Sequence, residues 1–140
     1  MLRVYVETSV WSIAFAGDTP DFRDATLAFF DACRASRLEP CISSVVLTEV
    51  RKSRQEVRQR ITGLIAEISP TVIPDSSAAD SLADAFVANR AVPPSKPEDA
   101  AHVAAAFVAG LDVLVSWNFK HIATVRRAER FNAVAVLNGY

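Results

Sequence analysis

The segment Leu2-Arg3-Val4-Tyr5-Val6-Glu7-Thr8-Ser9 sets the interpretation of the whole chain. Its first part, Leu2–Val6, is rich in apolar residues and predicts a β-strand. The polar triplet Glu7-Thr8-Ser9 follows directly and is typical of a point where a strand passes into a helix. A strand that leads straight into a helix indicates an α/β architecture.

Strands and helices are expected to alternate along the rest of the chain. Further strands are expected at 41–43, 71–73 and 112–116, and helices at 21–36, 44–68, 76–91, 95–109 and from 118 to about 138. Ser44 is expected to cap the helix at 44–68, and Ser95 with Glu98 has capping-box spacing, with Pro97 in the first turn. The alternation predicts a parallel sheet flanked by helices in one three-layer α/β domain over residues 1–140.

Composition limits the classes of function. The 140 residues include 15 Lys and Arg against 16 Asp and Glu, so the net charge of -1 gives no overall attraction to nucleic acid or membrane. A hydrophobic content of 51% excludes intrinsic disorder. Cys33 and Cys41 lack metal-type spacing and are expected to be small buried residues.

No segment has the pattern of a membrane helix or a signal peptide. The longest stretch without a charged residue, Ala100–Leu111, falls short of the ~18 apolar residues that a membrane helix needs. The chain begins with alternating apolar residues rather than a basic segment and a long apolar one. We therefore expect a soluble, cytoplasmic protein without a membrane partner.

Two acidic residues share helix faces with apolar ones. Asp99 lies on the face of Val103 and Phe107, and Glu49 follows Val46 by one helical turn. A carboxylate turned toward the core needs a partner, which helix N-terminal amides or a divalent cation can supply. Either acid alone is more often a cap or a salt-bridge partner, so it is the set that suggests a site.

The ends of two strands are expected to define a crevice. In an open parallel sheet, ligands bind beyond the carboxyl ends of the strands, where the strand order reverses. Glu7 ends the first strand and Asn118 follows the strand at 112–116, so the two side chains share a crevice if these strands are neighbours. Asp112 begins that last strand, at its opposite end, and is assigned to a loop.

Four segments, in this order, resemble the PIN domain. They are Glu7-Thr8-Ser9, Glu49 on the helix after the second strand, Pro97–His102, and Leu114–Ile122. The most specific of them is the run Ser-Trp-Asn-Phe-Lys-His-Ile within the last segment. The closest resemblance is to the VapC-like ribonuclease toxins, and it spans nearly the whole chain.

The resemblance implies a parallel sheet in the order 3-2-1-4-5 and Mg²⁺- or Mn²⁺-dependent cleavage of RNA at an acidic cluster. Glu7 stands where the family has its first-strand Asp, Glu49 matches the helical Glu, Asp99 the central Asp, and Asn118 the last acid. The family continues into a last strand for which this sequence has no counterpart. The resemblance also implies a homodimer and a small antitoxin as partners.

Two positions depart from the family pattern. Glu7 keeps the charge but adds a methylene, whereas Asn118 replaces a carboxylate by an amide and so weakens the expected affinity for metal. Our hypothesis is that Glu7 and Asp99 hold the metal, that the amide oxygen of Asn118 coordinates it or orients a water, and that Glu49 helps to deprotonate the attacking water. Supporting hydrogen bonds to the carboxylates or the scissile phosphate are expected from Thr8, Ser9 and Ser116.

Basic and aromatic residues suggest partners. Two basic runs flank the expected site and are either solvated helix faces or contacts for an RNA backbone; they comprise Arg51, Lys52, Arg54, Arg58 and Arg60, and Lys120, Arg126, Arg127 and Arg130. The candidates taken for RNA binding are Arg51, Arg54, Arg58 and Lys120. Phe22, Phe29 and Phe30 give one helix more aromatic surface than a single face buries, which indicates a dimer or a partner peptide.

The remaining candidates have simpler interpretations. His102 and His121 are expected to be hydrogen-bonded structural histidines, and Trp117 to pack rather than to stack on a base. The main alternative function is a catalytically weakened or inactive PIN domain that binds RNA or protein, because of the change at Asn118. A phosphoacceptor receiver domain is a weaker alternative, since Asp75 is its only candidate acceptor.

Overall fold

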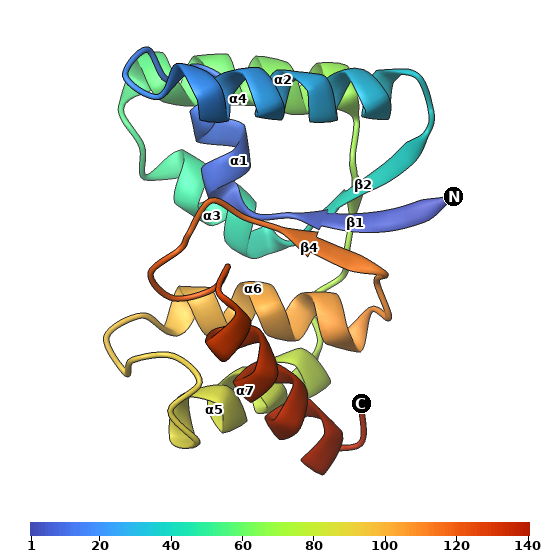
Figure 1. Cartoon of the computed structure of the whole chain (residues 1–140), viewed down its shortest axis with the longest axis vertical. Coiled ribbons are helices and arrows are strands. Elements are labelled where there is room, and N and C mark those ends of the chain that lie inside the picture. Colours follow the sequence, from blue (N-terminus) through green and yellow to red (C-terminus); the bar gives the residue numbers. More distant parts are fainter.

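A four-stranded parallel sheet lies at the centre of the computed structural model, which describes residues 1–140 (Figure 1). The strands are β1 (Leu2–Val6), β2 (Leu38–Ile42), β3 (Thr71–Val72) and β4 (Val113–Val115), in the spatial order β3-β2-β1-β4. Tyr5 pairs with Cys41 of β2 on one side and with Leu114 of β4 on the other. The predicted α/β class with a central parallel sheet is confirmed, and so is the assumption that β1 and β4 are neighbours.

Seven helices flank this sheet. They are α1 (Thr8–Ile13), α2 (Pro20–Arg34), α3 (Ser44–Arg51), α4 (Gln55–Ile68), α5 (Ser77–Ala88), α6 (Pro97–Val108) and α7 (Val125–Leu137). Helices α1, α2 and α4 cover one face, and α5, α6 and α7 lie on the other (Figure 1). Helix α3 contacts both α4 and α6, so it lies where the two layers meet.

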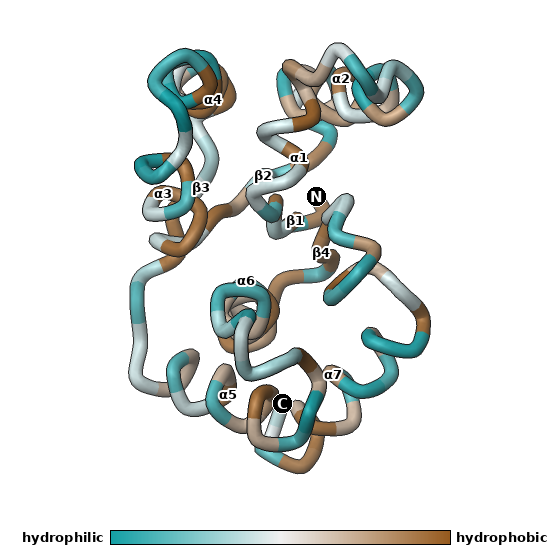
Figure 2. Tube along the Cα trace, turned by 90° about the vertical axis from the view of Figure 1, so that its left-hand side faces the viewer, coloured by the Kyte–Doolittle hydropathy of each residue, from teal (hydrophilic) through white to brown (hydrophobic).

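The buried apolar residues form two hydrophobic cores. The larger core joins β1 and β2 to the first helical layer and also includes Ala105 and Ala106 of α6. Its fully buried side chains include Tyr5, Trp11 and Phe30. The second core is built around Phe86 and Phe131, whose rings meet edge to face at 5.0 Å. Figure 2 shows the apolar stretches of the strands and of α6 toward the middle of the molecule. The sheet is therefore anchored on both sides, which fixes the positions of its strand ends.

The expected single helix over 44–68 is wrong. The chain forms α3 and α4 instead, with a break at 52–54, and Val57, expected on the apolar stripe, is exposed. The hydroxyl of Ser53 donates to the carbonyl of Val50 at 2.5 Å, and serine competes in this way with the helical hydrogen-bond pattern. The N-cap of α3 is Ser43 rather than Ser44.

Two other helix starts also differ from expectation. Residues 118–124 form a turn-rich loop, and α7 begins only at Val125 with Thr124 as its cap. Within the loop, the Asn118 carbonyl accepts from the amides of Ile122 and Ala123, which closes a turn before a helix can start. The N-cap position of α6 is Lys96, without a side-chain cap, so Ser95 does not form the expected capping box, although Pro97 occupies the first turn as predicted.

The tryptophan after β4 packs against α2. Trp117 stacks on Phe22 at 4.5 Å between ring centroids and donates its indole N–H to Thr26 at 2.8 Å. This confirms its predicted packing role. Phe30 is fully buried and Phe29 half-buried, so part of the aromatic excess of α2 is covered within the chain. None of the helices combines the length and apolar character needed to cross a membrane.

Candidate active site at the ends of β1 and β4

Glu7 lies where β1 passes into α1. Its backbone N–H donates to the carbonyl of Val115 at 3.1 Å, which extends the pairing of β1 with β4 by one residue. Its carboxylate then turns back to cap α1, accepting from the Ser9 backbone N–H at 2.9 Å. Only 5% of Glu7 is exposed. A carboxylate at the adjoining ends of two neighbouring strands is therefore a feature of the fold itself.

Hydroxyl groups orient the Glu7 carboxylate. The side chains of Ser9 and Ser116 both donate to its Oε2 atom, Ser116 at 3.1 Å. Ser9 in turn accepts from the Trp117 backbone N–H at 2.9 Å, and Ser116 from that of Asn118 at 2.9 Å. The expected hydrogen bonds from Ser9 and Ser116 to a carboxylate are present. All donors meet Oε2, so Oε1 is left without a hydrogen bond.

Asp99 comes to the same place from the first turn of α6 and is 9% exposed. Its own burial, assisted by the charge of Glu7, raises the pKa of Asp99 above its usual value. A hydrogen bond from Asn118 and the proximity of His121 oppose this shift without cancelling it. The residues that act on Asp99 come from three places: Glu7 at the end of β1, Asn118 and His121 in the loop after β4, and His102 on α6 itself.

Asn118 serves as a hydrogen-bonding partner of Asp99 in this structure. Its Oδ1 atom accepts from the His121 backbone N–H at 2.9 Å, while its side chain also bonds to the Asp99 carboxylate. Its predicted role as a metal ligand remains a prediction. The ring of His121 differs from expectation, because its Nδ1 atom is buried and has no hydrogen-bond partner. After Glu7 Oε1, the Nδ1 atom of His121 is therefore the second polar atom of the site without a hydrogen-bond partner.

Glu49 approaches from α3 and is joined to α1 through Thr8. The Thr8 hydroxyl donates to Glu49 Oε1 at 2.8 Å, and the same oxygen is bonded to His102 Nε2. Burial alone raises the pKa of Glu49, but the hydrogen bonds from His102 and Thr8 outweigh it, so this pKa lies below its usual value. Glu49 is consequently held ionised, and its Oε2 atom makes no hydrogen bond within the chain.

A buried chain of hydrogen bonds supports Glu49 from behind. His102 is fully buried, and its Nδ1 atom bonds to the Tyr5 hydroxyl at 2.6 Å, which bonds to the Ser43 hydroxyl at 2.7 Å. One neutral tautomer satisfies every group, with Ser43 donating to Tyr5, Tyr5 to Nδ1, and Nε2–H to Glu49. The expectation of a structural, hydrogen-bonded His102 is confirmed.

Tyr5 and Ser43 were not among the residues expected near the site. The signal for Tyr5 was present in the sequence, since a tyrosine between valines in a buried strand needs a partner for its hydroxyl. The identity of that partner was not, because His102 is 97 residues away along the chain. Burial also raises the pKa of the Tyr5 hydroxyl, which keeps it protonated and able to donate.

We expect Tyr5→Phe to lower the free energy of unfolding by about 1–3 kcal/mol, the cost of leaving buried polar groups unpaired. The substitution removes the hydroxyl between His102 and Ser43 without changing the ring. Urea denaturation measures the effect. Tyr140→Phe, at the 44% exposed Tyr140, is the matched control and should leave stability unchanged. If both variants are as stable as the wild type, the buried hydrogen bonds of Tyr5 with His102 and Ser43 contribute nothing to stability.

The carboxylate oxygens at the strand ends are of the kind that binds hard divalent cations. No three Cys, His, Asp or Glu side chains form a group that holds a metal ion by themselves. Mg²⁺, however, is commonly held in proteins by one or two carboxylates and keeps several waters. Glu7, with its free Oε1, and Asp99, with its raised pKa, are two such carboxylates.

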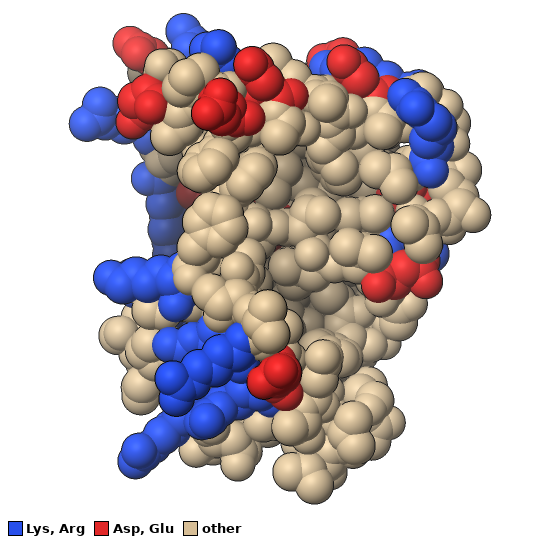
Figure 3. Space-filling model, in the orientation of Figure 1, with Lys and Arg blue, Asp and Glu red and all other residues tan.

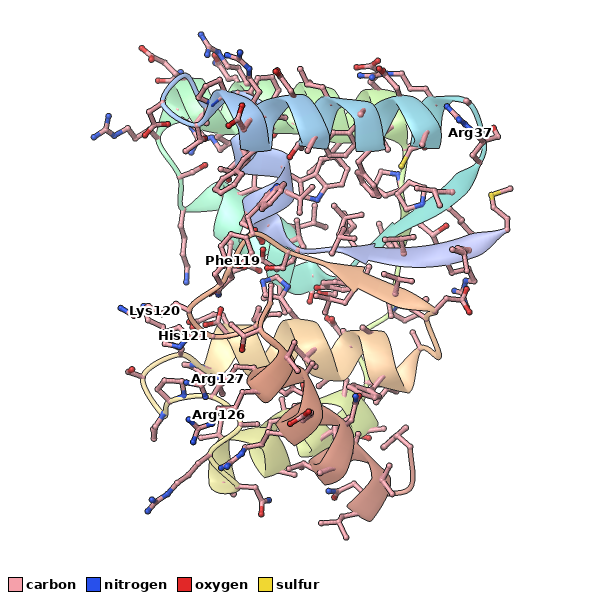
Figure 4. All side chains as sticks on the ribbon, viewed as in Figure 1. Arg37, Phe119, Lys120, His121, Arg126 and Arg127 are labelled. Carbon is pink, nitrogen blue, oxygen red and sulfur yellow. The ribbon has the colours of Figure 1, made fainter.

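The candidate RNA-binding residues lie in two places. Arg51 and Arg54 are exposed around the break between α3 and α4, where Arg58 donates to the Arg51 carbonyl at 3.3 Å. Lys120 is exposed in the loop after β4 (Figure 4). None of these four side chains forms a salt bridge. Their contact with RNA remains a prediction.

Comparisons with known proteins add no assignment. No protein-family model matches the chain, and no curated protein shows significant sequence similarity to it.

Proposed function

We propose that the chain is a Mg²⁺- or Mn²⁺-dependent endoribonuclease of the PIN type, whose active site is formed by Glu7, Asp99, Asn118 and Glu49. One observation carries the proposal. The buried carboxylate of Glu7 at the end of β1 is linked through the Ser116 hydroxyl to the backbone of Asn118, which follows the neighbouring β4, and both residues act on the buried carboxylate of Asp99. This edge of a parallel sheet is where α/β proteins bind their ligands.

The sheet order lends support to the PIN resemblance. The spatial order β3-β2-β1-β4 coincides with the first four positions of the order 3-2-1-4-5 that the resemblance implies. The fifth strand has no counterpart among the four strands of the structure. The order is common to other α/β proteins, so the functional proposal depends on the residues at the strand ends.

Each residue has a defined task in the proposed reaction. A divalent cation, when bound, lowers the pKa of a water and offsets the negative charge that builds on the phosphate. Glu7 and Asp99 hold that ion, and Ser9 and Ser116 keep Glu7 in one orientation. Glu49 is ionised with a free Oε2 atom, so it can accept the proton of the attacking water.

RNA cleavage by the purified protein tests this proposal. Structured cellular RNA is incubated with Mn²⁺, with Mg²⁺ or with EDTA. We expect discrete products with either metal and none with EDTA. Glu7→Gln should lower the rate by at least about 100-fold, the upper end of the loss seen when even outer partners of metal ligands are removed.

Asp112→Asn provides the matched control. Asp112 lies just before β4, at the end away from Asn118, and its carboxylate accepts from the Arg3 backbone N–H. This variant should cleave RNA like the wild type. Cleavage that persists in EDTA, or that Glu7→Gln leaves unchanged, would refute the proposed active site.

A second function, binding without cleavage, is favoured by one contact. Asn118 replaces a carboxylate and bonds to Asp99, so the site holds less negative charge than four acids would provide. An inactive PIN-type module would then bind RNA or protein through the same face. Folded wild type that yields no products with either metal would favour this alternative.

The partners implied by the resemblance remain proposals. Phe22 is 38% exposed even though it stacks on Trp117, so α2 offers limited apolar surface to a second copy or to an antitoxin. The homodimer and the antitoxin therefore rest on the resemblance, and the cytoplasmic location rests on the sequence. Light scattering of the purified chain measures its oligomeric state directly.

A further inference from the structure

Four arginines, and no other residues, line a hollow of about 270 Å³ next to the start of α7. They are Arg90, Arg126, Arg127 and Arg130. Figure 3 shows Lys and Arg side chains gathered in this part of the surface, over the α5–α6 loop and the start of α7. We call this hollow the arginine pocket.

The arginines of the arginine pocket form no ion pair within the chain. None of the four guanidinium groups has a carboxylate within 4.0 Å, since every salt bridge of the protein lies elsewhere. Arg126, Arg127 and Arg130 also stand on the first two turns of α7, where the positive end of the helix dipole disfavours cations. The like charges repel one another, and an anion in the hollow would relieve that repulsion.

The arginine pocket is held together by the backbone. Arg90 follows α5 in a left-handed conformation with φ of 57°, and the next residue, Ala91, is buried. The Ala91 carbonyl accepts from Arg127 Nη1 at 2.8 Å. This hydrogen bond ties the end of α5 to the start of α7, so the grouping of the arginines follows from the fold.

We propose that the arginine pocket binds a phosphate group of single-stranded RNA, an inference that rests on the proposed nuclease function. Guanidinium groups form paired hydrogen bonds with two phosphate oxygens, and an unpaired arginine cluster is a strong recognition element for phosphate. The phosphate comes either from the backbone of the strand or from its terminus. Both sources present the same oxygens to the pocket.

The position of the arginine pocket relates it to the candidate active site. The loop of residues 118–124 runs from Asn118 to the cap of α7, and it carries Lys120 and His121. In Figure 4, Lys120, His121, Arg127 and Arg126 follow one another along one side of the molecule. An RNA strand that binds there has one phosphate in the arginine pocket and another near the acidic residues of the candidate active site. The positive charge of the arginines offsets the negative charge of those acidic residues.

Fluorescence anisotropy with a labelled single-stranded RNA, in EDTA so that no cleavage occurs, tests the proposal. Arg126→Glu with Arg130→Glu is compared with Arg23→Glu plus Arg37→Glu, which changes the charge equally at arginines on other parts of the surface. The pocket variant should bind RNA at least about 10-fold more weakly than the control. The slope of log affinity against log salt should fall by about 0.7 for each phosphate that the variant no longer binds.

Two RNAs of one sequence, with a 5′-phosphate and with a 5′-hydroxyl, identify the source of the phosphate. Weaker binding of both RNAs by the pocket variant assigns a backbone phosphate, and loss of a preference for the 5′-phosphate assigns the terminal one. Inorganic phosphate should raise the melting temperature of the wild type but not of Arg126→Gln with Arg130→Gln, a variant without reversed charge.

Equal RNA binding by the pocket variant and the control, with both folded by circular dichroism, would overturn the proposal. That result would leave the proposed nuclease function standing, because binding is measured without cleavage. Conversely, arginine-dependent binding by a protein that cleaves no RNA would retain the arginine pocket and reject the nuclease.

Discussion

Asp99→Asn is expected to abolish RNA cleavage and, at the same time, to make the fold more stable. The loss of activity follows from removing one of the two carboxylates that the proposed site places at the ends of β1 and β4. We expect a rate at least about 100-fold lower, as for the other carboxylate. If Asp99→Asn raises stability and abolishes RNA cleavage, then Asp99 lowers the stability of the fold and is required for the reaction.

The gain in stability follows from the raised pKa of Asp99. An acid whose pKa is higher in the folded state binds more protons folded than unfolded between its unfolded value, about 3.9, and the raised folded value. Stability therefore falls as the pH rises through this window and remains reduced above it. The asparagine side chain carries no charge at any of these pH values, so the advantage of Asp99→Asn should be absent near pH 3 and should grow as the pH rises through this window.

Thermal unfolding in EDTA at several pH values measures the gain in stability of Asp99→Asn, and RNA cleavage at pH 7 measures its loss of activity. Glu98→Gln is the matched control, because Glu98 is exposed in the same turn of α6. It should cleave RNA like the wild type and gain no stability. A melting temperature of Asp99→Asn that lies below the wild type at pH 7 would show that the carboxylate is well paired rather than strained.

Trp11→Ala should lower the free energy of unfolding by about 3–5 kcal/mol, the usual cost of deleting a large buried aromatic side chain. Trp11 is fully buried, packs on Phe30 at 4.8 Å and donates its indole N–H to the Val6 carbonyl at 3.2 Å. A domain of ordinary stability, about 5–15 kcal/mol, loses a large share of it. The same packing holds α1, and with it Glu7 and Thr8, so the variant should also lose activity.

Urea denaturation of Trp11→Ala and Trp117→Ala compares the two tryptophans of the chain. Trp117 is half-buried and stacks on Phe22, so its removal leaves a smaller cavity and should cost less. A larger loss for Trp117→Ala would mean that the contact between α2 and the loop after β4 contributes more to stability than the core around α1.

The sequence predicted those parts of the fold that depend on local patterns. The junction at Glu7 was predicted because a buried strand meets a polar triplet, and Asp99 was predicted to face inward because its helix face is apolar. The break between α3 and α4 was missed, since it depends on the Ser53 hydroxyl competing for a helical carbonyl. Helical periodicity alone gives no sign of that competition.

The rest of the candidate site depends on contacts between distant residues. His102 was correctly expected to be hydrogen-bonded, but its partners lie on β1 and α3, and no spacing along the chain relates them. Three of the four arginines of the arginine pocket belong to the basic run that the sequence indicated, Arg126, Arg127 and Arg130. Arg90 joins them only because the end of α5 is tied to α7 through Ala91. Tertiary packing decides such groupings.

Binding of Mn²⁺, followed by electron paramagnetic resonance of the free ion, tests the proposed metal site without any RNA. We expect that the wild type and Glu98→Gln bind Mn²⁺, and that Glu7→Gln and Asp99→Asn each bind it at least about 10-fold more weakly. A wild type that binds no Mn²⁺, or variants that bind it equally well, would contradict a metal site at Glu7 and Asp99.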